Sequence, residues 1–155
     1  MHKRIISLAT LTQEVIKEFA TYASSSNIII SFKIEADVPE ISADPERTEM
    51  VIRNFIDNAI RYTTNSGNIK ISVACAGDSF VRWAIQDEGM GIEPYERRRV
   101  FDKFFRGRNA ILQQAEGSGV GLYVARAIID VAGGKLGFSS KPEKGSEFWF
   151  TLPIK

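Results

Sequence analysis

The 155-residue chain carries a net charge of +1, and 44% of its residues are hydrophobic and 25% are charged. This composition is that of a soluble globular protein, and it excludes an overall positive field that would draw the chain to nucleic acid. No apolar run reaches the roughly 18 residues that a membrane-spanning helix needs. The single cysteine, Cys75, excludes an internal disulfide and favours a reducing, cytoplasmic setting. Its place in the stretch NIKISVACA predicts a small buried thiol on a strand.

The first half of the chain predicts a helix, a strand, a second helix and a hairpin. Apolar residues at helical spacing predict a first helix from Ile5 to Tyr22, and the β-branched stretch NIIISFKIEAD is typical of a strand. The stretch ISADPERTEM predicts a helix that has Asp44 as N-cap and Pro45 at its first position and that runs to about Thr63. NIKISVACA and SFVRWAIQ alternate around the turn GDS and predict a hairpin.

The second half predicts a long loop, a helix and two strands. EPYERRRVFDKFF is compatible with a short helix, and residues 106–116 show no period, which is typical of a lid or a disordered loop. YVARAIIDVAGG predicts a helix closed by Gly133 and Gly134, and KLGFSSKPEKGSEFWFTLP predicts two strands joined by the turn PEKG. We expect one domain, residues 1–155, folded as a two-layer α/β sandwich with a mixed, mostly antiparallel sheet and its helices on one face.

Three glycines in five positions, Gly117, Gly119 and Gly121, precede the last predicted helix. A glycine-rich turn before a helix leaves backbone N–H groups pointing outward at the positive end of the helix dipole, where they can bind phosphate. The spacing differs from the dinucleotide-binding pattern, and the chain has no P-loop motif. Taken alone, the motif is equally consistent with a hinge or a packing site that binds no ligand.

A row of polar side chains lies along one face of the helix predicted after Asp44: Asn54, Asn58, Arg61 and Tyr62. Two asparagines one turn apart offer carbonyl oxygens to a hard cation such as Mg²⁺. Arg61 can pair with phosphate oxygens, and Tyr62 can present its ring to a base. The alternative is a solvated polar face, opposite the apolar face that packs on the core.

The stretch QDEGMGI follows a predicted strand. Asp87 lies where that strand ends, and Gly89 and Gly91 let the chain turn sharply there. A carboxylate held in a pocket can accept a hydrogen bond from the exocyclic amine of adenine, against an apolar wall supplied by Ile92. An ordinary acidic turn is the alternative, whereas the spaced acidic ligands of a calcium loop are absent from this stretch.

Taken in order, RNFIDNAIRYT, QDEGMGI, VFDKFFRG and GSGVGLYVAR resemble the four boxes of the ATP-binding catalytic domain of sensor histidine kinases. The resemblance extends from the first predicted strand to the closing KGSEFWFTLP. This kinase family belongs to the wider superfamily of gyrase, MutL and heat-shock-chaperone ATPases. It implies the same sandwich, with ATP and Mg²⁺ as cofactors. It also implies transfer of the γ-phosphoryl group to a histidine on a partner dimerisation and phosphoacceptor domain, which then serves a response regulator receiver domain. Neither nucleic-acid binding nor membrane insertion is implied.

The resemblance further implies a role for each motif residue. Asn58 would be the principal Mg²⁺ ligand, with Asn54 beside it ordering water, metal or phosphate, and Asp87 would read the adenine. The other nucleotide-binding residues that it implies are Arg61, Tyr62, Gly89, Gly91, Ile92, Gly117, Ser118, Gly119, Val120, Gly121, Leu122 and Ser146. Catalytic roles would fall to Asn54, which would orient the incoming imidazole or a water, and to Arg106, which would reach the γ-phosphate from a closing lid. Phe101, Phe104 and Phe105 would anchor that lid or, alternatively, belong to the core.

Kinases of this family phosphorylate a histidine on a separate helical hairpin, usually followed by an acidic residue. The single histidine here, His2, has no acidic residue after it, and we interpret it as incidental. We therefore expect an excised catalytic domain without the phosphoacceptor helices, and little or no self-phosphorylation. Two alternatives stay open at this point, namely a module that binds ATP without transferring phosphate and a serine kinase of the anti-sigma type from the same superfamily.

Overall fold

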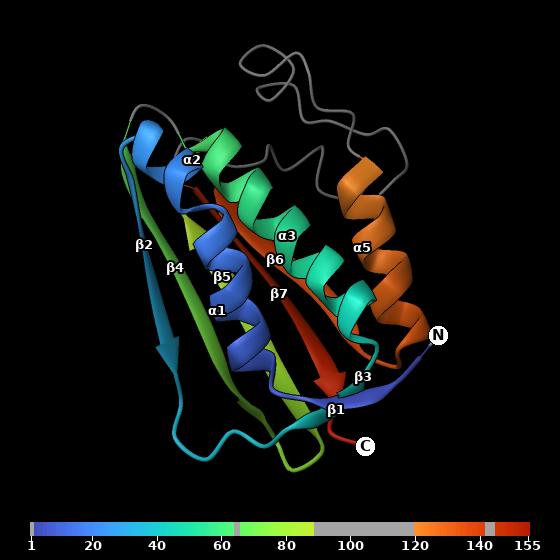
Figure 1. Ribbon diagram of the computed structural model, residues 1–155. Helices are drawn as coiled ribbons and strands as arrows, with labels where there is room; N and C mark the ends of the chain where they lie inside the picture. Colours follow the sequence, from blue (N-terminus) through green and yellow to red (C-terminus); the bar gives the residue numbers. More distant parts are fainter. Residues whose placement is uncertain (1, 64–65, 89–119, 142–144) are drawn as a thin grey trace.

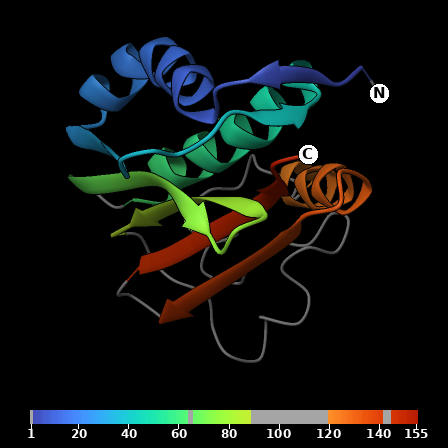
Figure 2. The same cartoon turned by 90° about the horizontal axis from the view of Figure 1, so that it is seen from below.

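The computed structural model describes residues 2–63, 66–88, 120–141 and 145–155. Helices cover one side of a five-stranded sheet, so the chain has the predicted two-layer sandwich (Figures 1 and 2). The elements in chain order are β1 (Arg4–Ile6), α1 (Leu8–Glu18), α2 (Ala20–Ser25), β2 (Ile28–Ile34), β3 (Ile41–Ala43), α3 (Pro45–Tyr62), β4 (Gly67–Ala76), β5 (Phe80–Asp87), α5 (Val120–Val131), β6 (Lys135–Lys141) and β7 (Gly145–Pro153). None of the helices in these ranges is long and apolar enough to cross a membrane.

The sheet has the strand order β2-β4-β5-β7-β6. Only β2 and β4 pair in parallel, and the other neighbours are antiparallel, which confirms the predicted mixed, mostly antiparallel sheet. The hairpin of β4 and β5 and the terminal pair of β6 and β7 lie where the sequence predicts them. Gly133, with a φ of +85°, follows the end of α5, as expected for a glycine that closes a helix.

The N-terminal segment differs from its prediction as a single helix from Ile5 to Tyr22. Residues Arg4–Ile6 form β1, which pairs antiparallel with β3. Helix α1 begins only after Ser7, whose hydroxyl accepts a hydrogen bond from the N–H of Thr10, and Phe19 separates it from α2. The prediction was wrong here because β1 is stabilised by pairing with a strand more than 30 residues away, which local periodicity does not report.

Helix α3 has the predicted start and length. The carboxylate of Asp44 accepts hydrogen bonds from the N–H groups of Glu46 and Arg47, at 3.0 and 3.2 Å, and Pro45 occupies the first turn. The helix then continues to Tyr62. Its apolar face packs on the sheet, where Phe55 lies against Trp83 and Phe150 with ring centroids 5.8 and 6.1 Å away.

Cys75 lies on β4 as predicted, but its side chain is exposed, so the prediction of a buried thiol was wrong. Cys75 shares its strand parity with the buried Ile69, Ile71 and Val73. It stands next to the last residue of β4 and beyond Val73, the last β4 residue that pairs with β2. Its ladder partner on β5, Val81, is buried, so Cys75 is exposed on the side of β4 where β2 has already ended.

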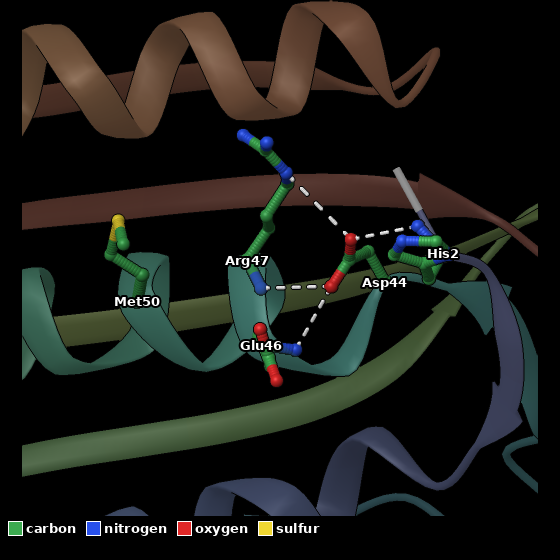
Figure 3. Close-up of a pocket in the computed structure, with 5 residues that line it drawn as sticks. All are labelled: His2, Asp44, Glu46, Arg47 and Met50. Carbon is green, nitrogen blue, oxygen red and sulfur yellow. Dashed lines mark hydrogen bonds and ion pairs between the residues drawn. The ribbon is translucent and has the colours of Figure 1, made fainter.

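A polar pocket lies at the N-terminal end of α3, lined by His2, Asp44, Glu46, Arg47 and Met50 (Figure 3). Asp44 joins the N-terminal residues to the start of α3 there, because its carboxylate also accepts a hydrogen bond from the backbone N–H of His2 at 3.0 Å. The bond from His2 is the main reason why the pKa of Asp44 lies below its ordinary value, and the N–H of Arg47 adds to the effect. The His2 backbone, rather than its imidazole, makes this contact.

Acidification should detach the N-terminal residues from α3. The depressed pKa of Asp44 means that its stabilising contribution is present above the ordinary aspartate value of about 3.9 and is lost as the pH falls below that value. Amide hydrogen exchange of His2, followed from pH 6 to pH 3, should therefore accelerate beyond the intrinsic pH trend. The same acceleration should be present at pH 6 in Asp44→Ala, and protection that does not depend on this carboxylate would contradict the assignment.

Candidate functional site

The polar face predicted on α3 exists, and its four side chains are all half-buried: Asn54, Asn58, Arg61 and Tyr62. None of the four is among the buried residues of the same helix, which include Phe55 and Ile56. The polar side chains are therefore neither core residues nor fully solvated. This is the environment expected of groups that line a binding site.

Asn54 connects α3 to the start of α5. Its amide nitrogen donates a hydrogen bond to the carbonyl oxygen of Gly121 at 3.2 Å, across 67 residues of sequence. A Cβ on Gly121 would lie 3.3 Å from the side-chain oxygen of Asn54, so glycine allows this close approach. Two predicted motifs, the asparagine face and the end of the glycine-rich stretch, are thus in direct contact. Leu122, the next residue, is half-buried and packs against the core.

Arg61 makes an ion pair with Asp57, one turn earlier on α3, with 3.1 Å between its Nη2 and the carboxylate. Both side chains are about one-third exposed or less. The carboxylate of Asp57 thus holds the guanidinium that was predicted to contact phosphate. Sequence reasoning missed Asp57, although its i,i+4 spacing to Arg61 is a recognisable signal for such a pair.

Asp87 and Ser146 form the second part of the site. They are opposite each other in the register of β5 and β7, and both are only 8% exposed. The backbone N–H of Ser146 donates to Oδ1 of Asp87 at 3.2 Å. The structure thus brings together two residues, 59 positions apart, that the resemblance assigned to nucleotide binding.

Gly145 is a further residue that this pair requires and that sequence reasoning did not assign to the site. It has a φ of +97°, and a Cβ there would overlap the carbonyl oxygen of Asp87. Only glycine lets the start of β7 approach the end of β5 so closely. The available signal was the glycine that closes the predicted turn PEKG.

All of these parts belong to one end of the sandwich. The C-terminal half of α3, the start of α5, the end of β5 and the start of β7 share the upper end in Figure 1. The remaining predicted site residues lie outside the described residues: Gly89, Gly91, Ile92, Arg106, Gly117, Ser118 and Gly119. The aromatic residues predicted to anchor a lid, Phe101, Phe104 and Phe105, also lie outside them.

Residues 43–155 match the model of a known family, the histidine kinase-, DNA gyrase B- and HSP90-like ATPases. The chain belongs to this ATPase family. The curated relatives include the adaptive-response sensory kinase SasA of a Synechocystis species, which is 35% identical over 154 residues, covering 99% of this chain and 40% of that protein. SasA of a Prochlorococcus marinus strain is 36% identical over 152 residues, covering 96% and 40%. The chain therefore spans about 40% of the length of these relatives.

Solved structures agree with this placement. The catalytic domain of the histidine kinase ThkA, in a nucleotide-free form, superimposes with a TM-score of 0.86 at 28% identity and covers 99% of both chains. Full-length ShkA in complex with AMPPNP gives a TM-score of 0.86 at 26% identity, covering 99% of this chain and 31% of that one. The chain is thus an ATPase domain of the kind found in histidine kinases, and its family binds ATP.

The donor set of this ATPase domain suits a hard cation. Within the described ranges, no group of three or more histidine, cysteine or acidic side chains is placed to hold a metal ion by itself. The amide oxygens of Asn54 and Asn58 lie on the half-buried face of α3. Mg²⁺ typically takes one or two protein oxygens and completes its shell with water and substrate phosphates. The residues present therefore fit a cation that is held partly by these amide oxygens and partly by the phosphates of a bound nucleotide.

Proposed function

We propose that residues 1–155 act as one catalytic domain that binds Mg-ATP and transfers its γ-phosphoryl group to a histidine on a partner dimerisation and phosphoacceptor domain. The observation that carries this proposal is the hydrogen bond from Asn54 to Gly121, which joins the asparagine face of α3 to the end of the glycine-rich motif. In an ATPase family, that contact favours a phosphate site between the two helices.

The base end of the proposed site is Asp87. An ionised carboxylate is an acceptor with about four lone-pair sites, so the bond from Ser146 leaves capacity for the exocyclic amine of adenine. Guanine presents a carbonyl oxygen at the equivalent position, and two acceptors facing each other in a buried site are unfavourable. The low exposure of Asp87 strengthens this discrimination. We therefore infer selectivity for adenine over guanine, with Tyr62 and Leu122 as neighbouring apolar walls.

The phosphate end of the proposed site is the polar face of α3. Asn58 and Asn54 would supply oxygen ligands, and Arg61 would pair with phosphate oxygens after it exchanges or shares its partner Asp57. When bound, Mg²⁺ neutralises charge on the transferring phosphate. Phosphoryl transfer requires mainly positioning and charge stabilisation, and the N–H groups at the start of α5 add to both. Asn54 and Arg106 are the residues proposed to act on the reacting groups.

The wider pathway is also a proposal. A solved structure similar to this chain shows ThkA in complex with the response regulator protein TrrA, with a TM-score of 0.82 at 27% identity. We infer that a receiver domain likewise takes the phosphoryl group from the partner of this domain, in the cytoplasm. Nothing in the proposed chemistry involves nucleic acid or insertion into a membrane.

Phosphotransfer in trans tests the proposal. The chain is incubated with radiolabelled ATP and Mg²⁺, alone and with the isolated phosphoacceptor domains of SasA and ThkA. We expect acid-labile label on an acceptor domain, no label when its histidine is replaced, and no stable label on the chain alone. Nucleotide binding without any transfer would favour the binding-module alternative, whereas acid-stable label on a serine would favour the anti-sigma type of kinase.

Asn58→Ala should weaken ATP binding in the presence of Mg²⁺ by about tenfold, a loss seen even for groups one shell removed from a metal. Binding in EDTA should change little, because the proposed role of the amide is to bind the cation. Asn58 lies off the core face, so the melting temperature should also change little. Calorimetric titration with and without Mg²⁺ measures the difference. Gln13→Ala, which removes an exposed side-chain amide on α1, is the matched control, and equal losses in EDTA would contradict a metal role.

A further inference from the structure

The end of β5 is tied to β4 by a side chain instead of by the strand ladder. The last pair of the β4–β5 register toward the start of β4 is Lys70 with Gln86, one residue short of Asp87. Beyond that pair, the carboxylate of Glu88 accepts a hydrogen bond from the backbone N–H of Asn68, with 2.6 Å between Oε1 and the nitrogen. The Glu88 side chain thus supplies the connection where the two backbones diverge.

The neighbouring backbone leaves room for this tie. A Cβ on Gly67 would lie 3.3 Å from Oε1 of Glu88 and 3.1 Å from the methyl group of Thr63, so a larger residue there would have to displace one of these side chains slightly. On the opposite side, Gly145 lies against the carbonyl oxygen of Asp87 and close to the Cα of Glu88. Residues 87 and 88 are therefore held between β4 and β7 by close backbone approaches and by the Glu88 carboxylate.

Asp87 is consequently fixed from two directions. The β7 strand holds it directly, through the register pair with Ser146 and the hydrogen bond to its Oδ1. The β4 strand is joined to the next residue, Glu88, by the hydrogen bond from Asn68, beyond the last pair of the β4–β5 register.

We propose that Glu88 is a positioning residue for Asp87, which sets the direction in which the Asp87 carboxylate meets the base of the nucleotide. This inference rests on the proposed role of Asp87 in adenine recognition. A carboxylate that is already oriented loses less conformational freedom when the base binds, so the tie improves affinity without contacting the ligand. The effect should be the same for ADP and ATP, because it concerns the base and not the γ-phosphate.

Two variants distinguish the loss of the hydrogen bond between Glu88 and Asn68 from the loss of the negative charge of Glu88. Glu88→Ala removes the acceptor, whereas Glu88→Gln keeps a carbonyl oxygen on a side chain of the same length. We expect Glu88→Ala to bind ADP about threefold to tenfold more weakly, as for the loss of one hydrogen bond, with an unchanged melting temperature. Glu88→Gln should stay within about twofold of the parent chain. Asp78→Ala, in the turn at the other end of the same hairpin, is the matched control and should bind ADP normally.

The backbone amide of Ser146 reports on Asp87 without nucleotide, because its N–H donates to the Asp87 carboxylate. In ¹H–¹⁵N spectra of the free protein, Glu88→Ala should shift or broaden the Ser146 signal, whereas Glu88→Gln and Asp78→Ala should leave it in place. An unmoved signal together with unchanged ADP affinity would overturn the proposal, as would losses equal to those of Asp78→Ala. If the parent chain does not bind ADP at all, the proposed nucleotide function fails, while the Ser146 signal still decides whether Glu88 orients Asp87.

Discussion

Phe55→Ala should lower the free energy of unfolding by about 3 to 5 kcal/mol, the range for removing a large aromatic side chain from a core. Phe55 is 1% exposed, and its ring lies 5.8 Å from Trp83, 5.6 Å from Phe148 and 6.1 Å from Phe150, measured between centroids. Three rings would face the cavity, and close-packed rings relax only partly to fill it. Urea denaturation with linear extrapolation measures the change.

The matched control is Met50→Ala, on the same helix. Met50 is 46% exposed, so its removal should change the free energy of unfolding by about 0.5 kcal/mol or less. The contrast tests the rotation of α3, because Met50 lies one turn before Asn54 on the same side of the helix, whereas Phe55 lies on the buried side. Similar losses from the two variants would mean that α3 is oriented differently, and the polar face would then lose its place in the proposed site.

Asp87→Asn should weaken the binding of ATP and of ADP by about 1.5 to 3 kcal/mol, or roughly tenfold to a hundredfold, as expected when a hydrogen bond loses its charged acceptor. The affinity for GTP should fall less or rise, because a side-chain amide can donate a hydrogen bond to the guanine carbonyl that a carboxylate repels. Calorimetric titrations with ATP, ADP and GTP measure both effects, and the adenine preference is the more specific of the two.

This variant should fold normally, because the side-chain oxygen of asparagine can still accept the hydrogen bond from Ser146. Glu147→Gln is the control, because it makes the same change from carboxylate to amide at the residue that follows Ser146 on β7. The Glu147 side chain is 37% exposed and pairs with Arg82. Equal nucleotide affinities for the Asp87 variant and the parent chain would remove Asp87 from the base pocket. A large fall in melting temperature would instead make the residue structural.

Much of the fold was predictable because its elements have local signals. The Asp44 cap with Pro45, the alternation of β4 and β5 around a turn, and the glycine after α5 are all read from neighbours in sequence. The failures are equally instructive. Strand β1 was predicted as helix because its partner β3 is distant, and Cys75 was predicted as buried because alternation does not reveal where the neighbouring strand β2 ends.

Some residues of the candidate site were likewise predicted from local sequence patterns, whereas others were recognised only in the structure. Side-chain chemistry at helical spacing identified Asn54, Asn58 and Arg61, and a strand followed by glycines identified Asp87. Neither pattern identified Glu88 or Gly145, because their importance comes from backbone approaches between β5 and its neighbours, β4 and β7. A glutamate in a turn and a glycine before a strand are too common to carry that information by themselves.

The sequence by itself thus determined the elements with short-range signals, the polar face of α3 and the chemical types available for a nucleotide site. The tertiary structure alone decided the parallel pairing of β2 with β4, the contact of Asn54 with Gly121 and the meeting of Asp87 with Ser146. These contacts join residues 38 or more positions apart in the chain. Such contacts form when whole faces of helices and strands are buried together, so their energies depend on how the layers pack. The residues that make them therefore show no local sequence pattern from which the contacts could be predicted.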